Sequence, residues 1–372
     1  MQYHCREVNI VLRILALDIG SGTEDILLYD DQKELENCIK IVLPSPASVY
    51  SKKVKYFTKI RSSLFIKGET IGGGTFSEAL KSHLDEGLKV ILTKNVAYSI
   101  RNKLEEVETQ GFQIIDEEKS PVDFSGETLE TREINISIIQ KFLSKFEEDL
   151  SNIDIVAIAV QDHGTPTHEI SNRKFRLNQI ERRLKYFPKL ESLAFEEDEL
   201  PDHFKRMKSA IRSSKSQIPE VKTIVMDTSI AAILGCLEDP KASNATTILS
   251  TNIGNEHFTA SIISEGNVLA LLEHHTSLMT PPKIESLVKD FIKGEVSNDT
   301  IFQDGGHGAF YTLTPKKIPD IDIIIITGPN RAKIKNTNIK AHFAAPGGDM
   351  MMTGPIGLIK AAKYKIKKED DD

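Results

Sequence analysis

The chain has 372 residues, of which 40% are hydrophobic and 27% charged, and its net charge is −7. This composition is ordinary for a water-soluble globular protein, and the length allows about two domains with a core each. A net negative charge disfavours nucleic acid or an anionic membrane as the main partner, and no apolar run approaches the ~20 residues that span a bilayer. Because the three cysteines are far apart and the N-terminus has no signal-peptide pattern, we expect a cytoplasmic protein without disulfides.

The first strong pattern is a glycine-rich turn between two apolar strands. Residues 12–17 are almost all apolar and predict a buried strand, residues 18–23 (Asp-Ile-Gly-Ser-Gly-Thr) predict a turn, and residues 26–29 predict the return strand of a hairpin. Glycines let the backbone approach a ligand closely, and the hydroxyl and N–H groups of such a turn can face phosphate oxygens. The alternative is a plain hairpin turn.

The rest of the first half alternates strands and helices. We expect strands at 36–42 and 90–92 and helices at 95–109 and 134–150, whereas the basic stretch 47–68 fits either a pair of strands or a mobile insertion. This rhythm is typical of an α/β layer.

A nearly continuous apolar run at 153–160 predicts a central strand that is covered on both faces. Asp162 and His163 follow almost at once, and ligands of open α/β sheets lie beyond the carboxyl ends of the strands. An Asp beside a His can activate a water molecule or bind a metal ion. The alternative is an Asp that only caps the turn. We expect the charged segment 177–220 on the outside of the first domain or in a lid.

The second half repeats the glycine turn. Residues 252–255 (Asn-Ile-Gly-Asn) align with residues 18–21, which lie 234 positions earlier, and both turns lie between apolar strands. This offset is too long for a solenoid repeat, so we expect two similar halves, each with a hairpin aimed at a shared cleft. The other elements expected around this turn are a strand at 221–226, a helix at 227–237, a helix at 280–294, a strand at 321–327 and a closing helix at 350–363.

These patterns resemble the actin-like ATPase superfamily, which includes sugar kinases, heat-shock chaperone ATPases and acetate kinases. The two glycine turns resemble its two phosphate loops, residues 227–239 resemble the helix before the second loop, and residues 323–331 fall at its adenosine loop. The resemblance implies a duplicated, ribonuclease H-like α/β fold with two domains around a central cleft. The expected parts are a first half at 1–240 with insertions near 43–75 and 177–220, a second half at 241–349, and a closing helix with a charged tail at 350–372.

The same resemblance implies roles for the residues of the cleft and a function, ATP-dependent phosphotransfer or hydrolysis on a small substrate. Asp18 would hold Mg²⁺ through water molecules, and Asp162, with His163 beside it, would activate a water or a hydroxyl group. Two positions depart from the superfamily pattern, since Asn252 replaces an aspartate and Pro329 a glycine. The phosphate contacts would come from Gly20, Ser21, Gly22, Thr23, Asn252, Gly254, Asn255 and Thr259, and the adenosine contacts from Gly328, Pro329, Asn330 and Arg331.

A closer resemblance, over roughly residues 12–362, is to domain-of-unknown-function family 1786, which is often labelled as a pyruvate formate-lyase activating enzyme. We discount this label, because such radical enzymes need three clustered cysteines for an iron–sulfur cluster and Cys5, Cys38 and Cys236 are far apart. The motifs that carry the resemblance are Gly72-Gly73-Gly74, Gln161-Asp162-His163-Gly164, Ser171-Asn172-Arg173, Glu273-His274-His275-Thr276, Asp304-Gly305-Gly306-His307-Gly308 and Gly347-Gly348-Asp349-Met350.

The histidines support a different prediction, a transition-metal site in the cleft. His163, His257, His275 and His307 all fall at strand ends or tight turns, and several of them can meet if the two halves close on one cleft. Two or three histidines with a carboxylate suit Zn²⁺, Fe²⁺ or Mn²⁺. A third possibility is a non-catalytic, nucleotide-responsive switch or scaffold. The candidate metal ligands are Asp18, His163, His275, His307, Asp304 and Asp349.

Overall fold

A computed structural model describes residues 11–371 except 118, 167–169 and 314–317. Its first sheet has the strand order β3-β2-β1-β8-β9. β1 pairs antiparallel with β2 and parallel with β8, so a hairpin continues into a parallel layer. Apolar residues alternate between the two faces of β1, which is why helices can cover both. The strands are β1 (Arg13–Ile19), β2 (Thr23–Asp30), β3 (Ile39–Pro44), β8 (Ile155–Val160) and β9 (Lys222–Met226).

The second sheet repeats this plan, with the order β13-β12-β11-β10-β14-β15. β10 pairs antiparallel with β11 and parallel with β14, as β1 does with β2 and β8, and β13 is an additional edge strand. This duplicated strand order confirms the predicted actin-like ATPase fold. The strands are β10 (Thr247–Ile253), β11 (His257–Ser264), β12 (Asn267–His275), β13 (Gly308–Tyr311), β14 (Ile323–Thr327) and β15 (His342–Phe343).

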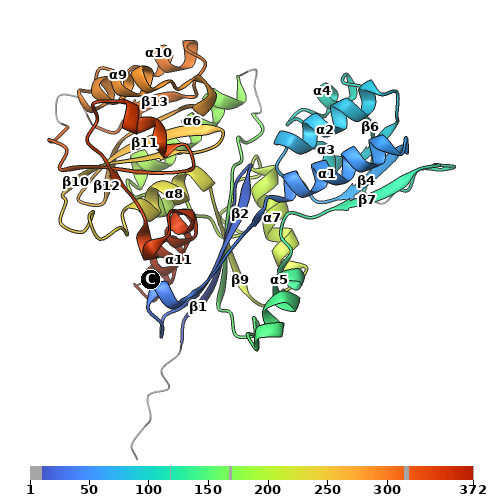
Figure 1. Ribbon diagram of the computed structural model, residues 1–372, viewed down its shortest axis with the longest axis horizontal. Coiled ribbons are helices and arrows are strands. Elements are labelled where there is room, and N and C mark those ends of the chain that lie inside the picture. The colour runs from blue at the N-terminus through green and yellow to red at the C-terminus, as the bar shows by residue number, and fades with distance from the viewer. Residues whose placement is uncertain (1–10, 118, 167–169, 314–317, 372) are drawn as a thin grey trace, which may run out of the picture.

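A separate α/β unit is inserted between β3 and β8. Its sheet is entirely parallel, with the order β6-β5-β4-β7, and it has a hydrophobic core of its own. Figure 1 shows it beside the first sheet, on the far side from the second sheet. Its elements are α1 (Pro46–Lys59), β4 (Leu64–Gly68), α2 (Gly74–Asp85), β5 (Val90–Thr93), α3 (Lys94–Ala97), α4 (Leu104–Glu108), β6 (Gln113–Ile115) and β7 (Glu127–Thr131).

Two predictions in this inserted unit were wrong. Residues 47–68 are neither a strand pair nor a mobile insertion, because Ser45 caps α1 by accepting a hydrogen bond from the Ser48 N–H, and β4 follows as one of the two inner strands of the sheet. Residues 95–109 do not form one helix. They contain two short helices, and between these the Asn102 side chain donates a hydrogen bond to the Gly164 carbonyl, which holds the connection against the first half.

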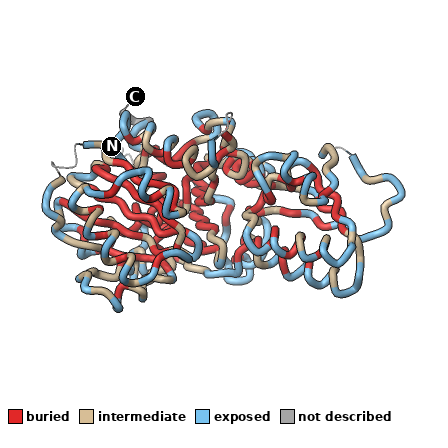
Figure 2. Tube along the Cα trace, turned by 90° about the horizontal axis from the view of Figure 1, so that it is seen from above, coloured by how far each residue is buried: buried red, intermediate tan, exposed pale blue. Residues whose placement is uncertain are grey.

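Helices cover both faces of the first sheet and join the two halves. α5 and α7 pack on one face, while α6, α8 and α11 form a shared core with residues of the second sheet on the other. Figure 2 shows the buried segments inside the two halves and inside the inserted unit. No helix within the described residues is long and apolar enough to cross a membrane. The helices are α5 (Ile136–Leu143), α6 (Asn172–Tyr186), α7 (Lys205–Lys215), α8 (Thr228–Cys236), α9 (Pro281–Ile292), α10 (Asn298–Gln303) and α11 (Thr353–Asp371). The 3₁₀ helices are η1 (Leu35–Asn37), η2 (Ser144–Phe146), η3 (Leu190–Leu193), η4 (Thr276–Leu278), η6 (Arg331–Asn336), η7 (Pro346–Gly348) and η8 (Met350–Met352).

Substituting Gly357 by alanine is expected to cost about 3 kcal/mol of folding free energy, at the upper end for overpacking. A Cβ at Gly357 would lie 1.9 Å from the Ala231 carbonyl oxygen, so α8 and α11 must separate. Chemical denaturation measures the loss. Gly266→Ala is the control, because a Cβ at Gly266 meets open space. Its expected loss of stability is only about 1 kcal/mol, from the unfavourable φ of +75°. Equal losses in both variants would contradict a close crossing of α8 and α11.

Candidate functional site

The two glycine turns share the same backbone hydrogen bond. In the first, the Gly20 N–H donates to the Thr23 carbonyl at 2.9 Å, and in the second the Gly254 N–H donates to the His257 carbonyl at 2.9 Å. The turns also face each other, because a Cβ built on Gly22 would lie 2.7 Å from the Asn255 side-chain nitrogen. The sequence repeat is therefore a structural repeat, and its two turns meet across a cleft.

A cavity of about 530 Å³ lies at this cleft. Its walls come from both halves, from the start of α11 and from the inserted unit, which contributes Gly72 to Gly74 and Tyr98 to Asn102. A volume of this size suits a small-molecule or cofactor site. The predicted residues that line it are Asp18, Gly20, Ser21, Thr23, Asp162, His163, Asn252, Gly254, Asn255, His275, Gly328 and Pro329, whereas Gly22, Thr259, Asn330, Arg331, Asp304, His307 and Asp349 are outside its lining.

Two buried carboxylates face each other beside the first turn. Asp18 and Asp25 are directly opposite in the β1–β2 register, and each is 8% exposed. The Oδ1 atom of each is buried and has no hydrogen-bond partner among the described residues. A Cβ on Gly354 would lie 1.8 Å from Asp18 Oδ2, so the start of α11 packs directly on this carboxylate. Such a site, rich in unpaired carboxylate oxygens, fits a hard divalent cation such as Mg²⁺.

Burial also makes this group of carboxyls difficult to ionise. It raises the pKa of Asp18 to about 7 and, together with the charge of Asp18, that of Asp25 to about 8. Burial and the nearby Glu133 raise the pKa of Glu24 to about 7. Asp25 was not among the predicted site residues. The sequence did contain a signal for this residue, since Asp25 is a carboxylate at the start of an otherwise apolar return strand. A four-residue turn between the paired strand residues then places Asp25 opposite Asp18.

Raising the pH from about 6.5 to 8.5 is expected to destabilise the metal-free protein. Over this range the folded protein loses protons from Asp18, Glu24 and Asp25 that the unfolded chain has already lost, so the free energy of unfolding falls as pH rises. The buried histidines of the cleft have lowered pKa values and act in the opposite direction only below about pH 6.5. The three carboxyls together correspond to a loss on the order of 3 kcal/mol. Thermal melts in EDTA across this range measure the effect, and Mg²⁺ should restore stability at pH 8. A melting temperature that rises with pH in EDTA between about pH 6.5 and 8.5 would contradict these shifts.

The predicted adenosine segment supports the second turn from behind. The Asn330 side chain donates to the Gly254 carbonyl at 3.0 Å, and the Asn330 N–H donates to the Ile253 carbonyl at 3.0 Å. Gly328 has a φ of +97°, and a Cβ there would lie 2.4 Å from the Ile253 carbonyl oxygen, so only glycine fits. Gly328 and Pro329 reach the cavity wall, while Asn330 and Arg331 hold the loop.

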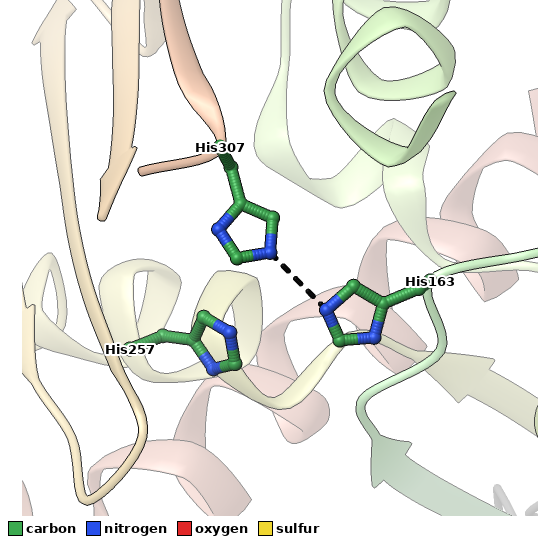
Figure 3. Close-up of side chains that lie close together, drawn as sticks. All are labelled: His163, His257 and His307. Atoms are coloured by element: carbon green, nitrogen blue, oxygen red, sulfur yellow. Dashed lines mark hydrogen bonds between the residues drawn. The ribbon is translucent and has the colours of Figure 1, made fainter. Parts of the chain in front are cut away.

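Four histidines lie close together at the cavity wall, three of them in its lining and His307 behind them. Potential ligand atoms of His163, His257 and His307 all lie within 4.8 Å of one another, and the His275 ring centroid is 4.9 Å from that of His307. Figure 3 shows the first three rings around one shared space. Burial lowers the pKa of His163 to about 3, of His257 to about 4 and of His307 to about 2, so all three rings are neutral at pH 7.

Three aspartates that were predicted as catalytic residues or metal ligands have other partners. Asp162 accepts hydrogen bonds from the backbone N–H groups of Gly164, Arg206 and Met207, which closes its turn and caps α7. Asp304 bonds His274 at 3.1 Å and pairs with Lys283. Asp349 accepts from the Met351 N–H, and its charge acts on Asp25 rather than on the histidines. None of the three therefore joins the histidine group.

A buried ion-pair network lies behind the histidines. Arg176, on α6, forms two hydrogen bonds with Asp227 at 2.6 and 2.9 Å and two with Glu273 at 2.9 and 3.1 Å. Asp227 is the N-cap of α8, whereas Glu273 is on β12 of the second sheet, so the network connects the two halves. Arg176 was not among the predicted site residues. No local pattern marks it, since the partners are distant in sequence.

The fold and the pair of facing turns define a protein of the actin-like ATPase type. Residues 71–333 match the family described as "Putative pyruvate format-lyase activating enzyme (DUF1786)", and the chain belongs to this family. No curated protein matches the sequence. An iron–sulfur cluster does not fit the described cysteines, because Cys38 and Cys236 are buried in separate hydrophobic cores.

Similar solved structures span nearly the whole chain at low identity. The Lmo2764 protein from Listeria monocytogenes is 9% identical with a TM-score of 0.38, covering 95% of this chain and 99% of its own. The ROK hexokinase from Thermus thermophilus is 12% identical with a TM-score of 0.34, covering 96% and 100%. A Bacteroides thetaiotaomicron protein with an actin-like ATPase fold and unknown function is 9% identical with a TM-score of 0.35, covering 95% and 98%. All three scores are below 0.5, so the duplicated strand order, and not these likenesses, defines the fold.

Proposed function

We propose that the protein binds a nucleoside triphosphate, ATP, with Mg²⁺ in the central cleft and transfers or hydrolyses its terminal phosphate. The observation that carries this proposal is the pair of turns with matching hydrogen bonds that face each other beside two buried carboxylates with unpaired oxygens. Backbone N–H groups of glycine-rich turns bind phosphate oxygens. A nucleotide that bridges the turns would contact both halves of the protein at once.

The charges of the cavity require a cation with the nucleotide. Asp18 and Asp25 would repel a triphosphate, so we infer that they hold Mg²⁺, which prefers carboxylate oxygens, water and phosphate as ligands. Bound Mg²⁺ would neutralise phosphate charge and withdraw electrons from the phosphorus–oxygen bonds. Asn252 replaces the aspartate that the superfamily has in the second turn. We infer that Asp25, beside the first turn, supplies the second carboxylate for Mg²⁺ instead.

We infer that the nucleotide and the second substrate occupy different walls of the cavity. Gly328 and Pro329, at the end of β14, would flank the adenosine, while Gly72 to Gly74 and Tyr98 to Asn102 of the inserted unit would contact a small second substrate. Asp162, whose oxygens already accept three backbone N–H groups, fixes the turn that places His163 at the wall. A cytoplasmic location, where ATP is available, is part of the same proposal.

Calorimetric titration of the purified protein with ATP tests the proposal. With Mg²⁺ present we expect saturable binding at micromolar concentrations and a higher melting temperature, since a ligand of the folded state raises stability. With EDTA in place of Mg²⁺ the binding should weaken strongly. No heat and no thermal stabilisation at millimolar ATP with Mg²⁺ would refute a nucleotide cleft.

A further inference from the structure

The histidine group is chemically distinct from the carboxylate site. His163 follows β8, His257 begins β11, and His307 lies just before β13, so three separate elements bring three imidazoles to one place. We propose that His163, His257 and His307 together bind one divalent transition-metal ion of the Zn²⁺ type. The proposal does not depend on the nucleotide proposal.

The distances suit one metal ion. His163 Nε2 and His307 Nε2 are 3.1 Å apart, close to the ~3.3 Å that separates two nitrogens bound to Zn²⁺ at ~2.0–2.1 Å in a tetrahedron. The ring centroid of His257 is 5.7 Å from that of His163 and 4.9 Å from that of His307. One potential ligand atom from each of the three rings lies within 4.8 Å of the others, so rotation of side chains can complete the set of three.

The donor atoms select the kind of metal. Neutral imidazole nitrogens favour Zn²⁺ and similar ions, whereas Mg²⁺ prefers oxygen. His307 Nε2, which is 3.1 Å from His163 Nε2, is the nitrogen that faces the metal position. The other ring nitrogen, Nδ1, is buried and has no hydrogen-bond partner among the described residues. Because buried polar atoms of structural side chains are almost always paired, this ring is not held by a complete set of hydrogen bonds and can turn to complete a ligand set.

The surroundings favour a cation. Glu273 is fully buried, and its charge acts on both His257 and His307. The network behind the rings contains one positive group, Arg176, and two negative ones, Asp227 and Glu273, so it carries a net negative charge. The backbone N–H of His307 also donates to the backbone carbonyl of Glu273 at 3.0 Å, which fixes the position of His307 on its segment.

The metal would connect the two halves and leave a position open to the cavity. His163 belongs to the first half and the other two ligands to the second. His163 and His257 line the cavity, so a fourth ligand, water or a substrate group, would face it. Three protein ligands with one open position are typical of catalytic rather than structural zinc.

Titration with Zn²⁺ alone, without nucleotide, tests this site. The protein is produced without a polyhistidine tag, treated with chelator and titrated calorimetrically. We expect one ion per chain, a higher melting temperature, and at least ~100-fold weaker binding in His163→Gln and in His307→Gln, since even loss of an outer-sphere partner costs 10–100-fold. His342→Gln is the matched control, because His342 bonds Asp239 outside the group, and its Zn²⁺ affinity should be unchanged.

A second readout separates loss of ligation from loss of folding. Co²⁺ in place of Zn²⁺ should give the visible absorption of a tetrahedral site in the native protein. The His163→Gln variant should lose this absorption while its circular dichroism is unchanged, because His163 lies on a turn at the cavity wall and not in a core. Absence of Zn²⁺ binding, or equal affinity in His163→Gln and His342→Gln, would overturn the proposal. Neither result would bear on ATP binding.

Discussion

Replacing Asp18 with asparagine is expected to change binding and stability in opposite directions. The affinity for ATP with Mg²⁺ should fall ~10- to 100-fold, because a charged contact contributes ~1.5–3 kcal/mol. The metal-free protein should instead become more stable at pH 8, by about 1–3 kcal/mol, because the substitution removes one of two facing buried charges. Calorimetric titration and thermal melts in EDTA measure the two effects.

Asp31→Asn is the matched control, since Asp31 is exposed beyond the far end of the same hairpin. It should change neither quantity. Asp25→Asn should repeat both effects of Asp18→Asn, because the two carboxylates share one site. If Asp18→Asn lowers the stability of the metal-free protein and leaves ATP affinity unchanged, the carboxylate pair is structural and holds no cation. Opposed effects of this kind are characteristic of strain kept at a binding site.

Arg176→Ala is expected to lower the free energy of unfolding by about 3–5 kcal/mol, the usual cost of removing one partner from a buried ion pair. The substitution leaves Asp227 and Glu273 buried and unpaired, and it removes a connection between the two halves. Urea denaturation measures the loss. Arg176→Lys should lose an intermediate amount, because an ammonium group keeps the charge but cannot form both two-bond contacts.

Arg182→Ala is the control on the same helix. Arg182 is exposed, and surface substitutions of this kind usually change stability by less than ~0.5 kcal/mol. A loss below about 1 kcal/mol in Arg176→Ala would show that the two carboxylates find other partners, and the network would then not join the halves.

The duplicated fold could be predicted because its signals are local. The sequence shows an apolar run before each turn, glycines within each turn, and a repeat that aligns Asp18 with Asn252. The apolar run at 153–160 predicts a central strand, and the resemblance to the actin-like ATPase superfamily, rather than this pattern, implied the duplicated fold. The helix at 46–59 was missed because its many lysines hide a modest buried face made by residues such as Tyr50 and Val54.

The site could be predicted only in part, since its chemistry depends on tertiary pairing. Asp162 looked like a catalytic residue in the sequence, but only the structure shows the three N–H groups that its oxygens accept. The partners of Asp304 lie on other segments in the same way. The juxtaposition of His163 with His307 depends on how the two sheets meet, and no spacing in the sequence contains that information.

The most direct test of a nucleotide cleft is a crystal structure with Mn²⁺ in place of Mg²⁺ and a non-hydrolysable ATP analogue. The anomalous signal of Mn²⁺ locates the cation independently of the nucleotide. We predict an anomalous peak beside Asp18 and Asp25, with the triphosphate between the turns at Gly20 and Gly254. A nucleotide bound outside this cleft, or no peak beside the two carboxylates, would contradict the account.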